Sequence, residues 1–222
     1  MSPAPVGSVR LFGSGNSDGV VQKVVYICLT VPPIGLDSHM LFAFTKATSA
    51  IPHFHLDAVK AGPSFAFHLD VVPRVDLGAN LRYINAVFDP LTPTWTEAKK
   101  IDGLTAADVG PKQQALFSPW MLTNRATESA FAQIEKPVNE YLDHWFRLVE
   151  QGLPADAAAP GDGAHFAHRD QQNRNAVFDP EVDKVWAQVD RLVGAQTSAA
   201  LRAILKNQGV EEEPPKNKAP VA

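Results

Sequence analysis

Two neighbouring segments, PHFHLDAV and SFAFHLDVV, carry histidines and carboxylates at every second position. Successive side chains of a β-strand point to opposite faces of the sheet. If both segments are strands, their polar residues gather on one side of each: His53, His55 and Asp57 in the first, and His68 and Asp70 in the second. A histidine beside a carboxylate can give up and recover a proton near neutral pH. These five residues are therefore candidates for general acid–base chemistry.

The AGPS segment between the two strands predicts a hairpin with a four-residue loop. Pairing Lys60 with Phe65 sets apolar residues opposite apolar residues, whereas a slip by one position would set them against polar ones. The same register predicts two cross-strand pairs, Asp57 opposite His68 and His55 opposite Asp70. We therefore expect two histidine–carboxylate pairs on one face of the sheet.

A second polar group occurs late in the chain, in the helical segment HFAHRDQQNR. If helices from this region cover the polar face of the sheet, the two groups line a cleft. If they do not, the face is an ordinary solvated one, as in many antiparallel sheets. The residue types favour the cleft, because a solvated face usually carries Lys, Thr, Glu and Ser rather than repeated His and Asp.

Other kinds of site have weaker support in the sequence. His53 and His55 resemble the paired ligands of a metal-binding β-barrel, and histidines with a carboxylate can hold non-haem iron. Those barrels usually place a glutamate several residues later, whereas Asp57 comes only two residues after His55. We therefore predict no metal, and leave the question open for this pair of histidines. The GSGNSDG stretch lacks the Gly-Lys-Ser/Thr ending of a P-loop. It contains the spacing G-x-S-x-G, but in a predicted turn between two strands, whereas the nucleophile elbow is a turn from a strand into a helix.

The overall composition is that of a globular protein. The 222 residues are 45% hydrophobic and 20% charged, enough apolar material for one sizeable core. A net charge of −4, with Lys and Arg scattered, argues against a nucleic-acid partner. We see neither a secretory signal nor an 18-residue apolar stretch, so we expect a cytoplasmic protein without a membrane partner. The oligomeric state is left open.

The chain divides into three parts by composition. We expect a loose N-terminus at 1–8, a single catalytic domain at 9–207, and a disordered tail at 208–222 that is rich in Glu, Pro and Lys. The single cysteine, Cys28, lies in an apolar run and is expected to be a small buried strand residue.

The elements that must position the polar residues change in type along the chain. Strand-like segments come first: SVRLFG, VVQKVVYICLTVP, HMLFAFTKA, the two segments described above, and then NLRYINAVFDP. From about Trp95 the spacing turns helical, with a long helix ending at Gly152 and further helices from Ala164 and near Pro180. Strands followed by helices predict an α+β fold, an α/β/α sandwich in which helices flank a central antiparallel sheet.

Three stretches carry a resemblance to a known family. LFAFTKATSAIPHFHLDAV, FAFHLDVVPRVDL and HRDQQNRNAVFDPEVDKVW resemble the red chlorophyll catabolite reductases, which belong with the ferredoxin-dependent bilin reductases. The resemblance covers roughly residues 38–205 and consists of moderately specific patterns. It implies a central antiparallel sheet between helix layers, with an open-chain tetrapyrrole bound between the sheet and the C-terminal helices.

The resemblance also implies roles for individual residues. The catalytic candidates are Asp57, where the family usually has an essential glutamate one methylene longer, His68, the neighbouring His55, and Asp170 in the late helix. The residues expected to bind the substrate are His53, Asp70, Arg74, His168, Asn173 and Arg174. Either arginine could anchor propionate groups, because a guanidinium pairs bidentately with a carboxylate.

We therefore expect reduction of a linear tetrapyrrole or a similar conjugated aromatic substrate, with electrons from a ferredoxin-like donor and protons from His and Asp. No flavin or nicotinamide motif is present, so we expect no tightly bound cofactor. Two alternatives stay open. One is a cofactor-independent lyase or isomerase that uses the same acid–base residues on a phenolic or diaryl substrate. The other is a noncatalytic tetrapyrrole binder. Turnover without added reductant would favour the lyase or isomerase.

Overall fold

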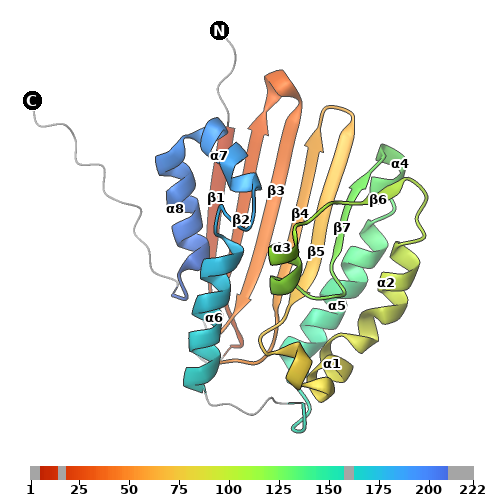
Figure 1. Cartoon of the computed structure of the whole chain (residues 1–222), viewed down its shortest axis with the longest axis vertical. Coiled ribbons are helices and arrows are strands. Elements are labelled where there is room, and N and C mark those ends of the chain that lie inside the picture. Colours follow the sequence, from red (N-terminus) through yellow and green to blue (C-terminus); the bar gives the residue numbers. More distant parts are fainter. Residues whose placement is uncertain (1–5, 15–18, 158–162, 210–222) are drawn as a thin grey trace, which may run out of the picture.

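A single antiparallel sheet between two layers of helices organises the computed structural model of the chain (Figure 1). The structure describes residues 6–14, 19–157 and 163–209. The strands are β1 (Val6–Gly13), β2 (Val21–Val31), β3 (Leu36–Thr45), β4 (His53–Ala61), β5 (Ser64–Val72), β6 (Leu104–Ala106) and β7 (Leu122–Ala126), in the spatial order β1-β2-β3-β4-β5-β7-β6. The predicted α+β fold, with helices flanking an antiparallel sheet, is confirmed.

The helices are α1 (Leu81–Val87), α2 (Thr92–Ala98), α3 (Pro111–Leu116), α4 (Glu128–Phe131), α5 (Glu135–Gln151), α6 (Gly163–Val177), α7 (Val185–Val193) and α8 (Ala195–Lys206). Short 3-10 turns occur at Pro32–Ile34, Leu77–Ala79 and Asp89–Leu91. Helix α5 ends where the sequence predicts, because Gly152 adopts a positive φ of 76° and its N–H still bonds to the carbonyl of Leu148.

The β4–β5 hairpin has the register that the hydrophobic pattern predicts. Lys60 lies opposite Phe65, and both predicted histidine–carboxylate pairs form, Asp57 opposite His68 and His55 opposite Asp70. Pairing continues one step further, to Ala61 opposite Ser64, so the turn is tighter than the predicted four-residue loop. Gly62 makes this possible, because its φ of 58° lies in the left-handed region.

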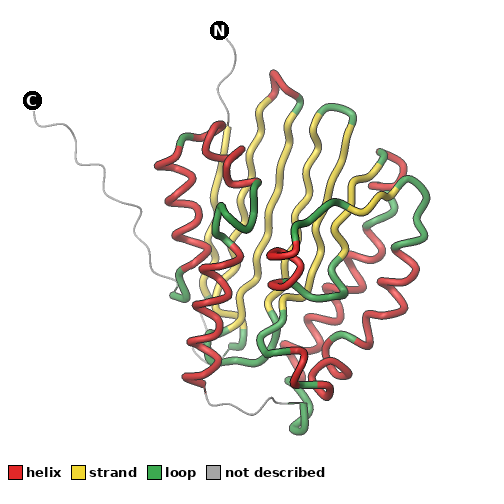
Figure 2. Tube along the Cα trace, viewed as in Figure 1, coloured by secondary structure: helices red, strands yellow, loops and turns green. Residues whose placement is uncertain are grey.

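The two faces of the sheet pack against different helices. On one face, Phe54, Phe67 and Leu69 pack with the α5 residues Tyr141 and Trp145. On the other, Phe42 and Phe44 pack with Phe178, Trp186 and Leu205, from the α6–α8 region. Figure 2 shows these two helical layers in red on either side of the yellow sheet. Alternation places the polar residues of β4 and β5 on the α6–α8 side, which we call the cavity face. The late helices thus cover the polar face, as expected.

Two domain boundaries differ from the prediction. Residues 6–8 are not loose but begin β1, because they pair with residues 28–30 of β2; residues 1–5 lie outside the described residues. At the other end, Gln208 belongs to the folded domain, because its amide donates to the carbonyl of Ala167 and to Asp170. Residues 210–222 of the predicted tail lie outside the described residues.

Several elements also differ from the prediction. The stretch that we grouped with the strands forms α1, in which Tyr83, Ile84 and Val87 lie at helical spacing and pack against the core. The short strands β6 and β7 were not predicted; β7 pairs with β5 and extends the sheet. Helix α7 starts at Val185 rather than near Pro180, and the loop that precedes it passes over the cavity face. Among the described residues, no helix combines the length and apolar character needed to cross a membrane.

Candidate functional site

A cavity of about 170 Å³ lies between the centre of the sheet and the helices of the cavity face. Residues on its sheet side include Phe42, His55, Asp57, His68 and Thr123, and residues on its helix side include Phe117, Phe178, Asp183 and Trp186. Three of the four predicted catalytic residues, His55, Asp57 and His68, are therefore brought together at one cavity. With Asp183 they form what we call the cavity cluster.

Aromatic stacking, rather than hydrogen bonding, holds the ring of His55. The ring lies nearly parallel to that of Phe42, with centroids 3.7 Å apart, and 5.8 Å from that of Phe117. Its Nε2 lies 3.0 Å from Oδ1 of Asp57, an ion-pair distance, but the two groups are not oriented as a hydrogen bond. Among the described residues, neither ring nitrogen has a hydrogen-bond partner. Because buried polar atoms are normally satisfied, this ring is well placed to meet a bound molecule.

His68 presents one nitrogen to the protein and leaves the other unsatisfied. Its Nδ1 lies 2.9 Å from the hydroxyl of Thr123, while Nε2 has no hydrogen-bond partner in the described part of the chain. Burial holds the pKa of His68 well below its usual value, and the nearby charge of His55 lowers the pKa further. His68 is therefore a neutral imidazole that can offer Nε2 to a ligand.

Two carboxyl groups meet the cavity from opposite sides. Asp57 points from β4, with 25% of its side chain exposed. Asp183 lies in the loop before α7, where its carboxylate accepts the N–H of Val185. Burial raises the pKa of Asp183, the charge of Asp57 raises it further, and the bond from Val185 opposes both. No sequence pattern singled out Asp183; the only signal was the helix break at FDP, which predicts a loop near this position.

His53 faces the same side of the sheet but has a different environment. The N–H of Thr45 donates to Nδ1 over 3.0 Å, so the ring proton resides on Nε2, which donates to Asp170 over 2.7 Å. Burial and the charge of Arg74 lower the pKa of His53 to about 3, despite the opposing effect of Asp170. His53 is therefore neutral, and both of its nitrogens are occupied within the protein.

Asp170 lies at the centre of a buried network with His53, Arg74 and Arg174. Burial alone would raise its pKa, but the bond from His53 and the charges of both arginines bring it below the usual range. Nε of Arg174 donates to its Oδ2 over 2.8 Å, and Nε of Arg74 lies 3.5 Å from Oδ1. Asp170 does not line the 170 Å³ cavity. The position of Asp170 therefore favours a structural role, in which it fixes α6 to β4, over the catalytic role that we predicted.

The two arginines, which were expected to contact substrate, are also enclosed. Each is 1% exposed. Arg74 donates to the hydroxyl of Thr45 and to the carbonyls of Lys46 and Ala47. Arg174 donates to the carbonyl of Asn207 and stacks over Phe44, with its guanidinium carbon 4.0 Å from the ring centroid. Neither arginine lines the 170 Å³ cavity, and protein acceptors bind part of each guanidinium; Nε of Arg74 and Nη2 of Arg174 have no hydrogen-bond partner among the described residues.

The remaining predicted binding residues also lie away from the cavity. His168 is exposed on α6. The amide of Asn173, further along the same helix, lies 3.5 Å from the carbonyl of Leu116. Asp70 is fully buried and accepts both the N–H and the hydroxyl of Ser118. Burial raises the pKa of Asp70 to about 6, although the bonds from Ser118 and the charge of His55 act in the opposite direction.

A second cavity, of about 410 Å³, adjoins the first between β1–β3 and the α7–α8 pair. Met40 and Trp186 line both cavities. The second is mainly apolar, with Ile27, Leu29, Val189 and Leu201 among its lining residues. Ligand sites typically measure about 300–1,000 Å³. The 170 Å³ cavity alone is smaller than this range, whereas the two together fall within it.

A larger depression, about 980 Å³, lies elsewhere, between α2 and α5. Its polar groups are mostly exposed, and those closest together pair with each other: Thr94 donates to Glu140, which also lies near Lys136. It holds none of the histidines. We therefore place the candidate site at the smaller cavity, where buried polar atoms lack partners among the described residues.

The fold is similar to that of a solved bilin-binding enzyme. Phytochromobilin synthase from tomato, whose structure was determined in complex with biliverdin, superimposes with a TM-score of 0.72 over 93% of this chain and 73% of that chain, at 14% sequence identity. No protein-family model and no curated protein matches the sequence. At this identity the likeness shows the fold alone, and at that level it supports the resemblance noted in the sequence.

Proposed function

We propose that the chain reduces a linear tetrapyrrole, or a conjugated molecule of similar length, bound between the sheet and α6–α8. One observation carries the proposal. The cavity cluster presents buried nitrogens of His55 and His68 that have no partner in the described residues, in a fold shared with an enzyme solved with biliverdin. Such atoms are costly to bury without a partner, so a ligand rich in N–H and C=O groups would satisfy them.

The reaction would add two electrons and two protons across one double bond of the conjugated system. The electrons would arrive one at a time from a ferredoxin-like protein, which becomes oxidised. Asp57 and Asp183 would supply the protons, since two carboxyl groups close together favour retention of a proton by one of them. His55, at ion-pair distance from Asp57, would return a proton to that carboxylate.

His68 would orient the substrate in this scheme. Its neutral ring offers Nε2 to the cavity while Thr123 holds Nδ1. A neutral imidazole can donate to a lactam carbonyl or accept from a pyrrole N–H, depending on its tautomer. The rings of Phe42, Phe117 and Phe178 around these groups exclude water, which strengthens each electrostatic contact.

Substrate length is the feature that most strongly constrains the proposal. An open-chain tetrapyrrole requires both cavities, so it would pass Met40 and Trp186, which line each of them. Methionine is flexible and adapts its shape readily. The 170 Å³ cavity alone would suit a single aromatic ring and would favour the alternative, a lyase or isomerase with a small phenolic substrate.

The test is an anaerobic assay with biliverdin and photoreduced ferredoxin, followed by visible absorption. We expect the biliverdin band to disappear only when reduced ferredoxin is present, at a rate that depends on protein concentration. Spectral binding without turnover under reducing conditions would instead identify a binder. Turnover of a phenolic compound without reductant, together with no spectral response to biliverdin, would favour the lyase or isomerase.

A further inference from the structure

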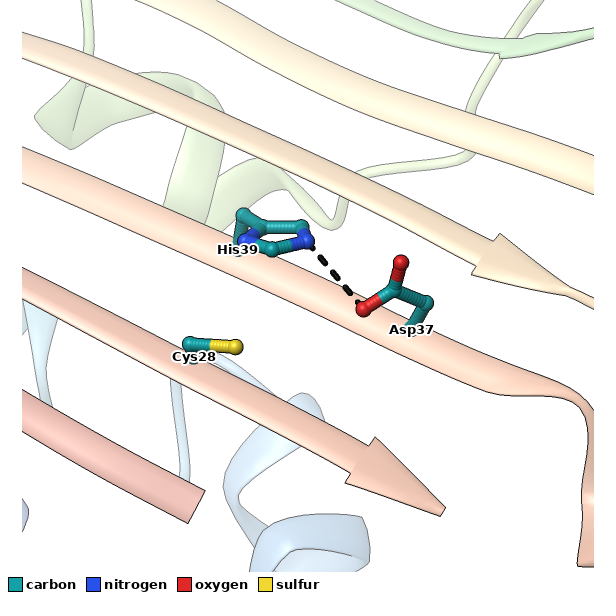
Figure 3. A group of neighbouring side chains, drawn as sticks. All are labelled: Cys28, Asp37 and His39. Carbon is teal, nitrogen blue, oxygen red and sulfur yellow. Dashed lines mark ion pairs between the residues drawn. The ribbon is translucent and has the colours of Figure 1, made fainter. Parts of the chain in front are cut away.

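A second group of chemically reactive side chains lies on the opposite face of the sheet, where β2 and β3 pair. Cys28 of β2 lies directly opposite His39 of β3, and Asp37 is two residues before His39 on the same face. Figure 3 shows these three side chains together, with the ion pair between Asp37 and His39 marked. Alternation directs the neighbouring Met40 to the cavity side, so this group is separate from the cavity cluster.

The geometry brings three different metal-binding atoms close together. One ligand atom from each of Cys28, Asp37 and His39 lies within 4.8 Å of the others. Nε2 of His39 lies 3.1 Å from Oδ1 of Asp37. Ligand atoms at about 2.0–2.3 Å from a tetrahedral zinc ion are separated by roughly 3.3–3.8 Å. Small side-chain movements would therefore bring all three onto one ion.

Tyr26 holds the imidazole in the orientation that such a site requires. Its hydroxyl lies 2.6 Å from Nδ1 of His39, and the two rings stack with centroids 6.0 Å apart. When Nδ1 carries the proton and donates it to this hydroxyl, Nε2 presents its lone pair toward Asp37 and Cys28. A metal-bound histidine usually has an outer partner of this kind on its other nitrogen.

We propose that Cys28, Asp37 and His39 bind Zn²⁺ or a similar borderline divalent cation, with a fourth position open to water or another ligand. Thiolate, imidazole and carboxylate are the three ligand types that zinc uses in proteins. An ion can enter from solvent, because the side chains of His39 and Asp37 are 42% and 51% exposed. Cys28 is half-buried, whereas the sequence predicted a buried residue. The proposal does not depend on the proposed function.

The test uses the untagged full chain with Zn²⁺ and Co²⁺. Zn²⁺ affinity is measured by competition with a chromophoric chelator, and the Co²⁺ complex by absorption. We expect one equivalent of either metal to bind, with a thiolate-to-cobalt charge-transfer band and the intense visible bands of four-coordinate Co²⁺. Cys28→Ser should abolish the charge-transfer band, and His39→Gln should weaken Zn²⁺ binding at least about 100-fold.

Matched variants separate this site from other histidines and from loss of folding. Tyr26→Phe should weaken Zn²⁺ binding by roughly 10- to 100-fold, the usual effect of losing an outer partner. Ser38→Ala, between the two β3 ligands but on the other face, and His55→Gln, in the cavity cluster, should leave it unchanged. Unchanged Zn²⁺ affinity in Cys28→Ser and His39→Gln, or a Co²⁺ complex without the charge-transfer band, would overturn the proposal.

Discussion

His53 and His55 are two residues apart on the same face of the same strand, yet their surroundings differ completely. His53 bonds through both nitrogens to Thr45 and Asp170. His55 is held by aromatic rings, and in the described part of the chain its nitrogens make no hydrogen bond. The carboxylate of Asp170 and both nitrogens of His53 are satisfied within the protein, although Nε of Arg74 and Nη2 of Arg174 have no hydrogen-bond partner in the described residues. In the cavity cluster, the imidazole nitrogens themselves are left without partners. The first arrangement serves stability and the second leaves capacity for a ligand.

The contrast shows that residue type alone does not identify a catalytic group. Both regions combine histidines with aspartates on the cavity face, and both are covered by the last helices. What separates them is the presence of two arginines beside Asp170, which fix its charge and occupy its oxygens. Replacing residues in each region should therefore affect different measurable quantities.

The largest expected effect is on stability, from Asp170→Asn. Loss of this charge leaves Arg74 and Arg174 buried without compensation, so unfolding free energy should fall by about 3–5 kcal/mol. Because the pKa of Asp170 is lowered by folding, its stabilisation is present above the ordinary value of 3.8 and is lost as pH falls through the lower folded value. Urea unfolding at neutral and acidic pH measures the loss of unfolding free energy and its dependence on pH. A stable variant with abolished turnover would instead restore Asp170 as a catalytic residue.

The next effect is on rate, from Asp57→Asn. Loss of a positioned proton donor typically lowers turnover by ~10²–10⁴-fold. Biliverdin affinity and unfolding free energy should change little, because Asp57 is partly exposed and its ion pair is with His55 rather than with a buried arginine. Asp102→Asn, in an exposed turn, is the matched control. Equal turnover by both variants would exclude Asp57 from the chemistry.

A smaller effect is expected on substrate affinity, from Met40→Trp. The larger ring would obstruct the passage between the two cavities, and overpacking of this kind costs about 1–3 kcal/mol. Biliverdin binding, measured by visible titration, should weaken by roughly 5- to 150-fold. Binding of a single-ring phenol should be unaffected. If biliverdin binds the variant as tightly as the unmodified chain, the two cavities do not act as one site.

The smallest expected effect is a change in the pKa of Asp70. This residue lies in the β4–β5 hairpin and is affected by the charge of His55 in the cavity cluster. Ser118→Ala removes a hydrogen bond to the carboxylate, so the pKa of Asp70 should rise above about 6. His55→Gln should raise it less, because the charge of His55 acts more weakly on Asp70 than the bonds from Ser118 do. Carboxyl carbon NMR titration measures both, with Ser38→Ala as the control. A lower pKa in either variant would contradict the assigned causes.

The parts of the molecule that sequence reasoning predicts correctly are those governed by short periodic patterns. Strand alternation predicts the Asp57–His68 register, because any slip would bury polar side chains against apolar ones. Helical spacing predicts α5, and the glycine after it predicts its end. The order of these elements is sufficient for the fold class.

The parts that sequence reasoning misses depend on contacts between distant segments. Asp170 and His53 are 117 positions apart, and no local pattern shows that two arginines saturate that carboxylate. Asp183 reaches the cavity only because the loop before α7 crosses the sheet. Short strands such as β7 carry too few residues for alternation to identify them.

The central claim is that the cavity cluster receives a long conjugated substrate, and the most direct test is a crystal structure with biliverdin. The account predicts the tetrapyrrole between the sheet and α6–α8, beyond Met40 into the second cavity, with Nε2 of His68 bonded to a pyrrole or lactam group. Biliverdin bound elsewhere, or a cavity that admits only a small molecule beside His55 and Asp57, would contradict it.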